Sequence, residues 1–533
     1  MNRPNKELLT KRMNKLPLLI LALASATAAC AQQNATAVKY AGLITAEDAK
    51  KHLSILASDA FEGRETGKPG AEKAANYIAG EFKKLGLQGP VNGSYFFDVP
   101  LTENGLKVTA FTINGKAFEF GTDFYFGGSF PDKSTSVNDV VFVGYGTDEE
   151  IGSIDLTGKI VLWINEDKPV AGTTPNTSYR MSTARTKIVK NLQSKKPAII
   201  LAANPGIGAV LSRFGKSITS PRLTIKDESS KPANTSAPVI NINGPMADEL
   251  VKPAGKTYAD LKSASAAAIV PAATIKNDVV VNYISVKKDV KAVDVLGYMP
   301  GTDLKDEVLI FSAHYDHIGL VADEKAKDKV NNGADDDGSG TTGILEIARA
   351  FAKAKKDGHG PRRSILFLGN VGEEKGLLGS EYYSDHPVFP LANTITDLNI
   401  DMIGRVGEEY IGKPDSANYV YPIGSAMLSK ELHQIGEDAN NTYTKLKLDY
   451  KYDDPNDPNR FYYRSDHYNF AKHGVPIIFY FNGVHADYHQ PGDEVSKINF
   501  PLLAKRAQLV FYTGWELANR DKRPVVDGNA GKE

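Results

Sequence analysis

Residues 307–317, "EVLIFSAHYDH", join a short apolar run directly to side chains that can bind metals. A near-continuous apolar run is typical of a strand buried on both faces of a sheet, because a half-buried strand alternates polar and apolar residues. His314, Tyr315 and Asp316 follow at the point where this strand is expected to end. The stretch therefore predicts a buried strand of an α/β sheet, with side chains that can bind metals at its carboxyl end.

Three further apolar runs repeat this arrangement. They are "RSILFLGNV" (363–371), "TDLNI" (396–400) and "VPIIFYFNG" (475–483). Glu373 and Glu374 follow the first run, Asp401 follows the second, and the segment "HADYHQPGDE" (485–494) follows the third. The carboxyl ends of strands in an open α/β sheet share one edge, where ligands bind. We expect these imidazoles and carboxylates to converge there.

Helical segments alternate with these strands, and a region with a different pattern of apolar and polar residues interrupts them. The segments 71–85 and 340–354 place apolar residues three and four positions apart, which predicts amphipathic helices. Short β-type runs divided by polar turns fill the region from about 104 to 284. The pattern predicts an α/β domain interrupted by a β-rich insert. The predicted boundaries are a leader at 1–30, main-domain parts at 41–103 and 285–522, the insert at 104–284 and a polar tail at 523–533.

The composition and the N-terminal segment limit the class of protein. The chain has 533 residues, 24% of them charged, and a formal net charge of -1, so no basic excess indicates nucleic-acid binding. The apolar run Leu16–Ala29 follows a basic stretch and is typical of an export signal, because it is too short for a stable membrane anchor. Cys30, the only cysteine, follows two alanines and resembles a bacterial lipobox. We expect an exported bacterial lipoprotein, periplasmic or outer-membrane-anchored, that is acylated at Cys30; the alternative is a free periplasmic protein released by ordinary signal peptidase at Ala29-Cys30-Ala31.

The segment "NNGADDDGSG" (331–340) places three aspartates between glycines. Such a turn is either solvated at the surface or held by a cation, because adjacent carboxylates repel each other. A histidine and carboxylate set without thiols suits zinc, or manganese or cobalt, better than calcium. An EF-hand alignment fails, since it puts Gly333 and Ile344 where Asp and Glu are required. Two carboxylate-bridged ions would explain the crowded charges.

Together these motifs resemble the co-catalytic di-zinc exopeptidases. This family includes secreted bacterial leucine-type aminopeptidases, glutamate carboxypeptidase and the transferrin receptor. The resemblance extends from "FEGRETGKPGAEKAANYIAGEFKKLGL" (61–87) through "VLGYMPGTDLKDEVLIFSAHYDHIG" (295–319) to "YRSDHYNFAKHGVPIIFYFNGVHADYHQPGDE" (463–494). The insert resembles a protease-associated domain. The family's fold implies a mixed, mostly parallel central sheet with helices on both faces.

The resemblance implies a ligand set for two zinc ions. His314 and Asp401 would bind one ion, and Glu374 and His489 the other. Asp336 would bridge them, and its peptide bond to Asp337 would be cis. We expect His489 rather than the nearby His485 to be the ligand, because only His489 lies in the "DYH" context.

The resemblance also implies residues that assist the ligands. Glu373 would be the general base that activates a metal-bridging water. Tyr488 matches a tyrosine that donates to the oxyanion in some relatives. Asp316 would orient the His314 imidazole. His317 and His467 are expected to be packing or supporting residues.

The sequence also predicts the exposure or capping role of three further residues. Asp335 is expected to be a solvated turn residue, and Asp337 to cap the helix that begins near Ser339. Asp294 stands where the family has asparagine, and this departure is expected to lie at the surface.

The expected function is that of an exported di-zinc metallo-aminopeptidase that removes N-terminal residues from peptides. One alternative is a carboxypeptidase of the same family that acts on acidic C-terminal residues, for which Arg405 and Arg464 lie near the motifs. A glutaminyl cyclase and a non-catalytic binding relative are the others. Peptides are the expected partners, with membrane contact only through a lipid anchor, and the oligomeric state stays open.

Overall fold

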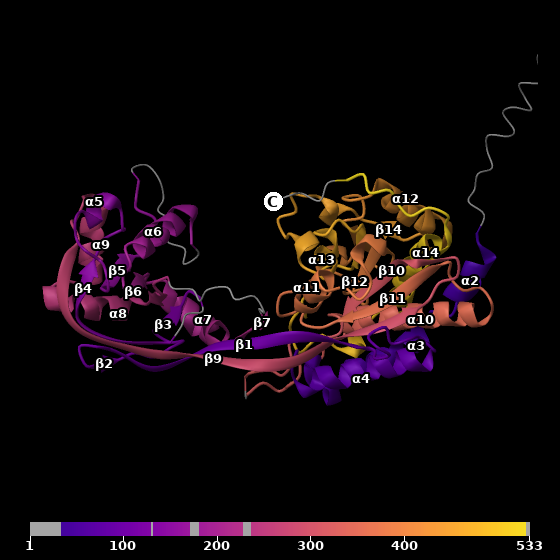
Figure 1. Cartoon of the computed structure of the whole chain (residues 1–533), viewed down its shortest axis with the longest axis horizontal. Helices are drawn as coiled ribbons and strands as arrows, with labels where there is room; N and C mark the ends of the chain where they lie inside the picture. The colour runs from indigo at the N-terminus through magenta and orange to yellow at the C-terminus, as the bar shows by residue number, and fades with distance from the viewer. Residues whose placement is uncertain (1–32, 129–131, 171–180, 227–235, 324, 529–533) are drawn as a thin grey trace, which may run out of the picture. The chain divides into compact units, whose positions relative to one another are not determined.

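The computed structural model describes residues 33–128, 132–170, 181–226, 236–323 and 325–528, so the predicted leader and Cys30 lie outside the described residues. The chain divides into two compact units (Figure 1). Unit 1 comprises Met1–Val99 and Lys291–Glu533, and unit 2 comprises Pro100–Val290. The described residues include no helix with the length and apolar character needed to cross a membrane.

Unit 1 is built on a mixed, mostly parallel sheet, as predicted. In spatial order its strands are β14 (Lys447–Leu448), β13 (Tyr419–Ile423), β15 (Ile477–Phe481), β12 (Thr394–Ile400), β10 (Leu304–His314), β11 (Arg363–Asn370) and the end of β9 (Ala273–Met299). Strand β10 runs parallel to both β11 and β12, and β12 runs parallel to β15. The four predicted apolar runs are therefore parallel neighbours that end at one edge.

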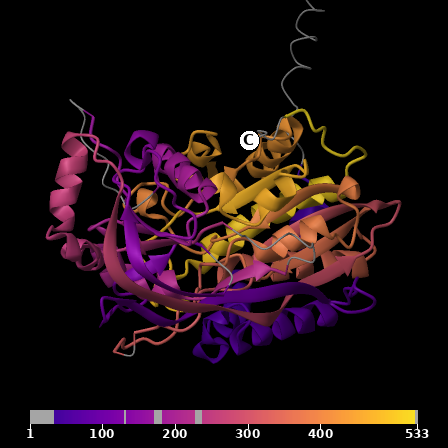
Figure 2. The same ribbon diagram turned by 60° about the vertical axis from the view of Figure 1, so that its left-hand side comes forward.

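Helices cover both faces of this sheet. They are α2 (Ala35–Ala41), α3 (Ala46–Leu56), α4 (Pro69–Lys84), α10 (Gly338–Lys356), α11 (Leu378–Asp385), α12 (Lys430–Ala439), α13 (His467–Ala471) and α14 (Phe500–Asn519). Figures 1 and 2 both show α3 and α4, in indigo, along one side of the unit. The two predicted helices are confirmed as α4 and α10, and both bury the apolar stripe expected of them.

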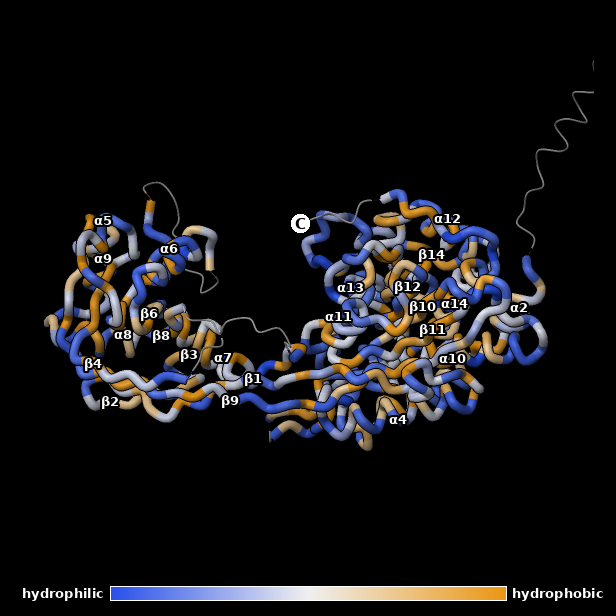
Figure 3. The backbone as a smooth tube through the Cα atoms, in the orientation of Figure 1, coloured by the Kyte–Doolittle hydropathy of each residue, from blue (hydrophilic) through white to orange (hydrophobic). Residues whose placement is uncertain are grey.

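The side chains of β10 and β11 alternate between the two faces. Phe311 stacks on Phe367, and their rings lie 5.8 Å from Phe351 of α10 and 6.2 Å from Phe82 of α4, respectively. The neighbouring residue Ile310 belongs to a separate core cluster with residues of α11 and α13. Because both faces are covered, these strands are apolar throughout, and they form orange segments in Figure 3.

One polar side chain in this core titrates far from its ordinary range. Asp397 of β12 is fully buried and accepts a hydrogen bond of 2.7 Å from the Ser312 hydroxyl. Burial, the main cause, raises the pKa of Asp397 to about 8. The folded state therefore keeps a proton on Asp397 that the unfolded chain releases near pH 4.

We expect the free energy of unfolding to fall by a few kcal/mol as the pH rises from about 4 to about 8, and Asp397→Asn to remove part of that fall. The stabilisation is complete below the unfolded pKa and is lost as the pH rises through the folded one. Denaturant titrations across this range measure the difference, with the exposed Asp306→Asn as the matched control. Superimposable pH profiles for wild type and Asp397→Asn would contradict the expectation.

Unit 2 has its own core around a largely parallel sheet. The parallel strands are β4 (Lys133–Phe142), β5 (Ile160–Ile164), β6 (Ile199–Ala203) and β8 (Val239–Ile242), and β3 (Phe124–Phe126) pairs antiparallel to β8. The first part of β9 pairs antiparallel to β4, while β1 (Phe96–Ile113) pairs with β2 (Lys116–Ala117) and β7 (Arg222–Ile225). The helices are α5 (Asp148–Ile151), α6 (Thr183–Ser194), α7 (Ile207–Thr219), α8 (Gly244–Val251) and α9 (Tyr258–Ala267).

Candidate metal centre

The strand ends of unit 1 bring the predicted ligands together. His314 is the last residue of β10, and Asp401 follows the last residue of β12. The His314 Nε2 atom lies 3.6 Å from Asp401 Oδ1 and 3.3 Å from Asp336 Oδ1. Residues that are far apart in sequence thus meet at the edge of the sheet, as the strand pattern predicts.

A second group of ligand-type atoms lies on the other side of Asp336. His489 Nε2 is 3.2 Å from Asp336 Oδ2 and 3.0 Å from Glu374 Oε2. Each oxygen of Asp336 therefore faces a different histidine. This is the arrangement that the resemblance implies for a carboxylate bridging two ions.

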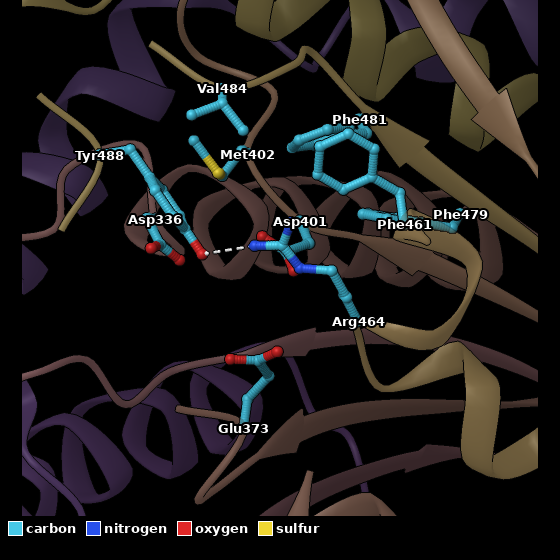
Figure 4. Close-up of a pocket in the computed structure, with 10 residues that line it drawn as sticks. All are labelled: Asp336, Glu373, Asp401, Met402, Phe461, Arg464, Phe479, Phe481, Val484 and Tyr488. Carbon is cyan, nitrogen blue, oxygen red and sulfur yellow. Dashed lines mark hydrogen bonds between the residues drawn. The ribbon is translucent and has the colours of Figure 1, made fainter. Parts of the chain in front are cut away.

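Glu373, the expected general base, faces this cluster from the loop after β11. Its Oε2 atom lies 3.8 Å from His314 Nε2, and its side chain keeps 12% of its area exposed. Burial raises the pKa of Glu373 well above its ordinary value. In Figure 4 its carboxylate lies across the pocket from Asp336 and Asp401.

His317 lies closer to the cluster than its expected packing role implies. Its Nδ1 atom lies 2.8 Å from Glu374 Oε1 and 3.8 Å from Asp336 Oδ2, and its side chain is fully buried. His317, Asp336 and Glu374 form one group of atoms close enough to hold an ion, and His314, Glu373 and Asp401 form another. The sequence signal for His317 is the second histidine of "AHYDH", which is a weaker signal than His314 because it does not itself end the strand.

The donor atoms fit divalent cations such as zinc. Five of them are buried and have no hydrogen-bond partner among the described residues: His314 Nε2, His317 Nδ1, Asp336 Oδ2, Glu374 Oε1 and His489 Nε2. Although burial opposes it, contacts with Asp336 and Glu374 raise the pKa of His489 to about 10. A buried group of carboxylates that draws positive charge onto an imidazole suits a site for imidazole- and oxygen-binding metals.

The loop 331–340 shapes the bridging ligand. The Asp336–Asp337 peptide bond is cis, as the resemblance implies. The Asp337 carboxylate accepts a hydrogen bond of 2.8 Å from the Gly340 amide, which confirms Asp337 as the cap of α10. Gly333 has a φ of +54°, and a β-carbon there would lie 2.5 Å from the His317 ring. Glycine is required at this position because the backbone carbonyl oxygen of Asp336, 2.3 Å from such a carbon, and the His317 ring fill the space.

The expectation that Asp335 is a solvated turn residue is wrong. Asp335 is fully buried, and its Oδ1 atom accepts hydrogen bonds from the Ser339 hydroxyl and the Gly404 amide. Its Oδ2 atom lies 3.2 Å from His485 Nε2. The contact places His485 beside Asp335, whereas His489 faces Asp336 and Glu374. Asp335 is buried because its carboxylate contacts the segments that carry Gly404 and His485.

Asp493 also holds the loop 331–340 in place through hydrogen bonds to its backbone. Its Oδ2 atom accepts hydrogen bonds of 2.9 Å from the Asp335 amide and 3.0 Å from the Asp336 amide. Its backbone carbonyl accepts a third from the Ala334 amide. Three successive amides of the loop thus end on one residue, four positions after His489 in the sequence.

We expect Asp493→Leu to lower the melting temperature and weaken metal binding more than Asp493→Asn does. The leucine leaves two buried amides without an acceptor, at a cost of about 1–3 kcal/mol each, whereas asparagine keeps one acceptor oxygen. Thermal unfolding and zinc titration of both variants measure the difference. Equal losses in the two variants would show that the charge of Asp493, and not its acceptor role, matters.

Arg64, from the glycine-rich segment before α4, holds the strand end and the loop together. Its buried guanidinium donates to the carbonyls of Tyr315 at 2.8 Å and Leu56 at 2.8 Å, and to those of Asn332 at 2.7 Å and Gly333 at 2.9 Å. No pattern in the sequence indicates this role, because an arginine in a polar turn is ordinarily solvated.

Two expectations about supporting acids need correction. The Asp316 backbone carbonyl, rather than its carboxylate, lies within hydrogen-bond distance of His314 Nδ1, at 3.1 Å. The carboxylate accepts from the Thr66 hydroxyl and the Glu373 amide instead. Asp294 is fully buried rather than at the surface, and its Oδ1 atom accepts a hydrogen bond of 2.8 Å from the Val371 amide. Asp294 therefore supports the start of the loop that carries Glu373.

A pocket opens beside the cluster, with an apolar wall. Met402, Phe461, Phe479, Phe481 and Val484 line this wall, with Arg464 and Tyr488 at its polar side (Figure 4). The Arg464 guanidinium lies 3.4 Å from the Tyr488 hydroxyl, and the Tyr488 ring stacks on His489.

The remaining candidates lie outside the pocket lining. Arg405 pairs with Asp487 and Asp493, so it offers no second cation to a bound carboxylate. His467 packs on Phe479, and burial lowers its pKa to about 3, as fits a packing residue.

Comparisons with known proteins show which chains and folds this protein resembles. Residues 294–514 match the model of peptidase family M28. The chain is 27% identical over 244 residues to aminopeptidase YwaD of Bacillus subtilis strain 168, covering 43% of this chain and 46% of the relative. It is 28% identical over 270 residues to a probable zinc metalloprotease of Pyrenophora tritici-repentis strain Pt-1C-BFP, covering 43% and 52%. The matches span about half the length of these relatives.

Solved structures share the fold over most of the chain. An aminopeptidase from Aneurinibacillus sp. strain AM-1 superposes with a TM-score of 0.54 at 19% identity, covering 92% of this chain and 98% of the other. The zinc aminopeptidase BSAP from Bacillus subtilis gives a TM-score of 0.50 at 19% identity, covering 90% and 96%. The segment that holds these ligand-type side chains is therefore similar to peptidase family M28, and the chain shares its α/β fold with solved aminopeptidases.

Proposed function

We propose that this protein is a di-zinc metallo-aminopeptidase that removes N-terminal residues from peptides. The observation that carries the proposal is the position of Asp336 between His314 on one side and His489 on the other. Asp401 and Glu374 complete the two groups. Two divalent ions held there would polarise the scissile carbonyl and lower the pKa of water.

The residues of the chain supply the proton transfers and the substrate contacts. Glu373 accepts a proton from the attacking water and passes it to the leaving amine. The Tyr488 hydroxyl, at the edge of the pocket, donates to the oxyanion that develops on the carbonyl. The resemblance supports both assignments, together with the position of each side chain in the pocket lining.

The pocket favours an apolar N-terminal residue as the substrate. Its wall of aromatic and aliphatic side chains suits a leucine or phenylalanine side chain. Among the described residues, Arg464 is the only arginine or lysine that lines this pocket, and Arg405 is paired elsewhere. A carboxypeptidase that binds acidic C-terminal residues through clustered arginines is less well supported.

A panel of 4-nitroanilides tests the function. We expect hydrolysis of leucyl- and phenylalanyl-4-nitroanilide, loss of this activity with a chelator and its recovery with zinc. Glutamyl-4-nitroanilide and N-blocked dipeptides with acidic C-termini should be poor substrates. Chelator-insensitive hydrolysis, or cleavage confined to the acidic C-termini, would refute the proposal.

Export, with a lipid anchor at Cys30, is part of the proposal and rests on the leader sequence alone. Labelling of the expressed protein with radioactive palmitate, compared with Cys30→Ala, tests the anchor. Label in the wild type alone is expected, and an unlabelled wild type would exclude the anchor.

A further inference from the structure

Unit 2 contains a cleft of about 850 Å³ that the metal centre does not use. Residues of β1, β3, α7, β7 and β9 contribute to its lining, and all the lining residues lie within Pro100–Val290. This volume lies in the range of sites that hold small ligands or short peptide segments. The cleft is therefore a candidate binding site formed by unit 2 alone.

One wall of the cleft is an apolar stripe on α7. Val210, Phe214 and Ile218 stand four positions apart and all line the cleft. Phe214 keeps 46% of its area exposed, although Leu211 on the same helix is buried in the core. Leu106 and Phe120 also contribute apolar surface to the lining. An aromatic side chain left open beside other apolar groups is suited to an apolar ligand.

The charged residues of the described lining are all basic. Arg222 of β7 and Lys287 of β9 contribute to it, and none of the described lining residues is an aspartate or glutamate. Within the described part of the chain, neither Arg222 nor Lys287 forms a salt bridge. Two cations and no acid among the described lining residues favour a ligand that carries a carboxylate.

Strand β7 gives the cleft a backbone that can bind an extended chain. Its residues pair with β1, from Leu101 opposite Ile225 to Asn104 opposite Arg222. Among the described residues β7 pairs with no strand other than β1, so its second edge has no described partner. Arg222 and Thr224 line the cleft from alternate positions of β7, which sets their side chains on the same face as the ligand. An extended peptide can add to such an edge, and this distinguishes a peptide from other apolar acids.

We propose that the cleft of unit 2 binds the C-terminal end of peptides with apolar side chains. The peptide backbone pairs with the open edge of β7, and its apolar side chains contact the α7 stripe. Arg222 and Lys287 bind the terminal carboxylate. The inference rests on the proposed function for the class of ligand, since a peptidase of this kind meets such peptides. It assigns unit 2 a peptide-binding role of its own, separate from hydrolysis.

Fluorescence anisotropy with the full chain tests the site. The probe is a hexapeptide that ends in Phe-Leu and carries fluorescein on its N-terminus, which blocks removal of its first residue. We expect the form with a free carboxylate to bind, and the C-terminally amidated form to bind at least about ten-fold more weakly. The double variant Arg222→Glu/Lys287→Glu should lower the affinity for the free form by a similar factor, and Phe214→Ser should lower it for both forms.

Two controls separate the cleft from the metal centre and from folding. Lys187→Glu/Lys190→Glu reverses two exposed charges on α6 outside the cleft and should bind the peptide as the wild type does. All variants should hydrolyse leucyl-4-nitroanilide at the wild-type rate, because this substrate has no C-terminal carboxylate. The proposal is overturned if the wild type does not bind the free peptide, if amidation has no effect, or if the α6 control weakens binding equally. A wild type that does not hydrolyse leucyl-4-nitroanilide would instead count against the proposed function.

Discussion

Glu373→Gln should lower kcat for leucyl-4-nitroanilide by about 10²–10⁴-fold and leave the zinc content unchanged. Glutamine has nearly the same size but cannot accept the proton of the attacking water. The side chain lies at the cluster, 3.8 Å from His314 Nε2, without occupying the Asp336 position between the two histidines. Loss of proton transfer with retained metal is therefore the expected signature of this residue.

Steady-state kinetics and metal analysis of the same preparation measure both quantities. Glu381→Gln on α11 is the matched control, because Glu381 is partly exposed and lies in the same stretch of chain outside the pocket lining. A Glu373→Gln protein with wild-type kcat would remove the residue from the role of base. A variant that has lost zinc would instead make Glu373 a ligand, as its grouping with His314 and Asp401 allows.

Asp336→Asn should have the second large effect, on metal binding. Each carboxylate oxygen of Asp336 faces a different histidine, so the substitution weakens both groups at once. We expect zinc affinity to fall by more than about 100-fold and peptidase activity to be lost with it. Asp401→Asn should affect mainly the His314 group.

Zinc titration by calorimetry and by thermal unfolding tests this result. A ligand that binds the folded state raises the melting temperature with its concentration, so the wild type should be stabilised by zinc and Asp336→Asn much less. The metal-free proteins should unfold at similar temperatures, which separates loss of binding from loss of folding. Asp306→Asn, an exposed change in β10, is the control. Equal stabilisation of wild type and Asp336→Asn by zinc would rule out a bridging role.

The sequence predicts the sheet and the meeting of the polar groups because both follow from local patterns. Strands covered on both faces are apolar throughout, and parallel strands end at one edge, so the strand pattern alone places His314 and Asp401 together. The two helices follow from the spacing of their apolar residues. Each of these patterns can be recognised within one segment, without knowledge of the segments that pack against it.

The supporting residues cannot be predicted in the same way. Asp335 and Asp294 are expected to be exposed, but both are buried because amides from distant segments donate to them. The roles of Arg64 and Asp493 depend on carbonyls and amides of other loops, which have no side-chain signature in the sequence. Burial of a charged residue in a loop is a tertiary property, and periodicity within a segment carries no information about it.

The contact between Arg64 and the loop 331–340 also affects the order in which the parts of the protein fold during synthesis. Arg64 and Gly333 are 269 positions apart, and the whole of unit 2 is synthesised between them. At the usual rates of translation, the Arg64 guanidinium leaves the ribosome on the order of tens of seconds before the carbonyl it will bind. The loop that holds Asp336 can therefore reach its final form only after unit 2 has been made, so in each newly made molecule the metal centre is among the last parts to mature.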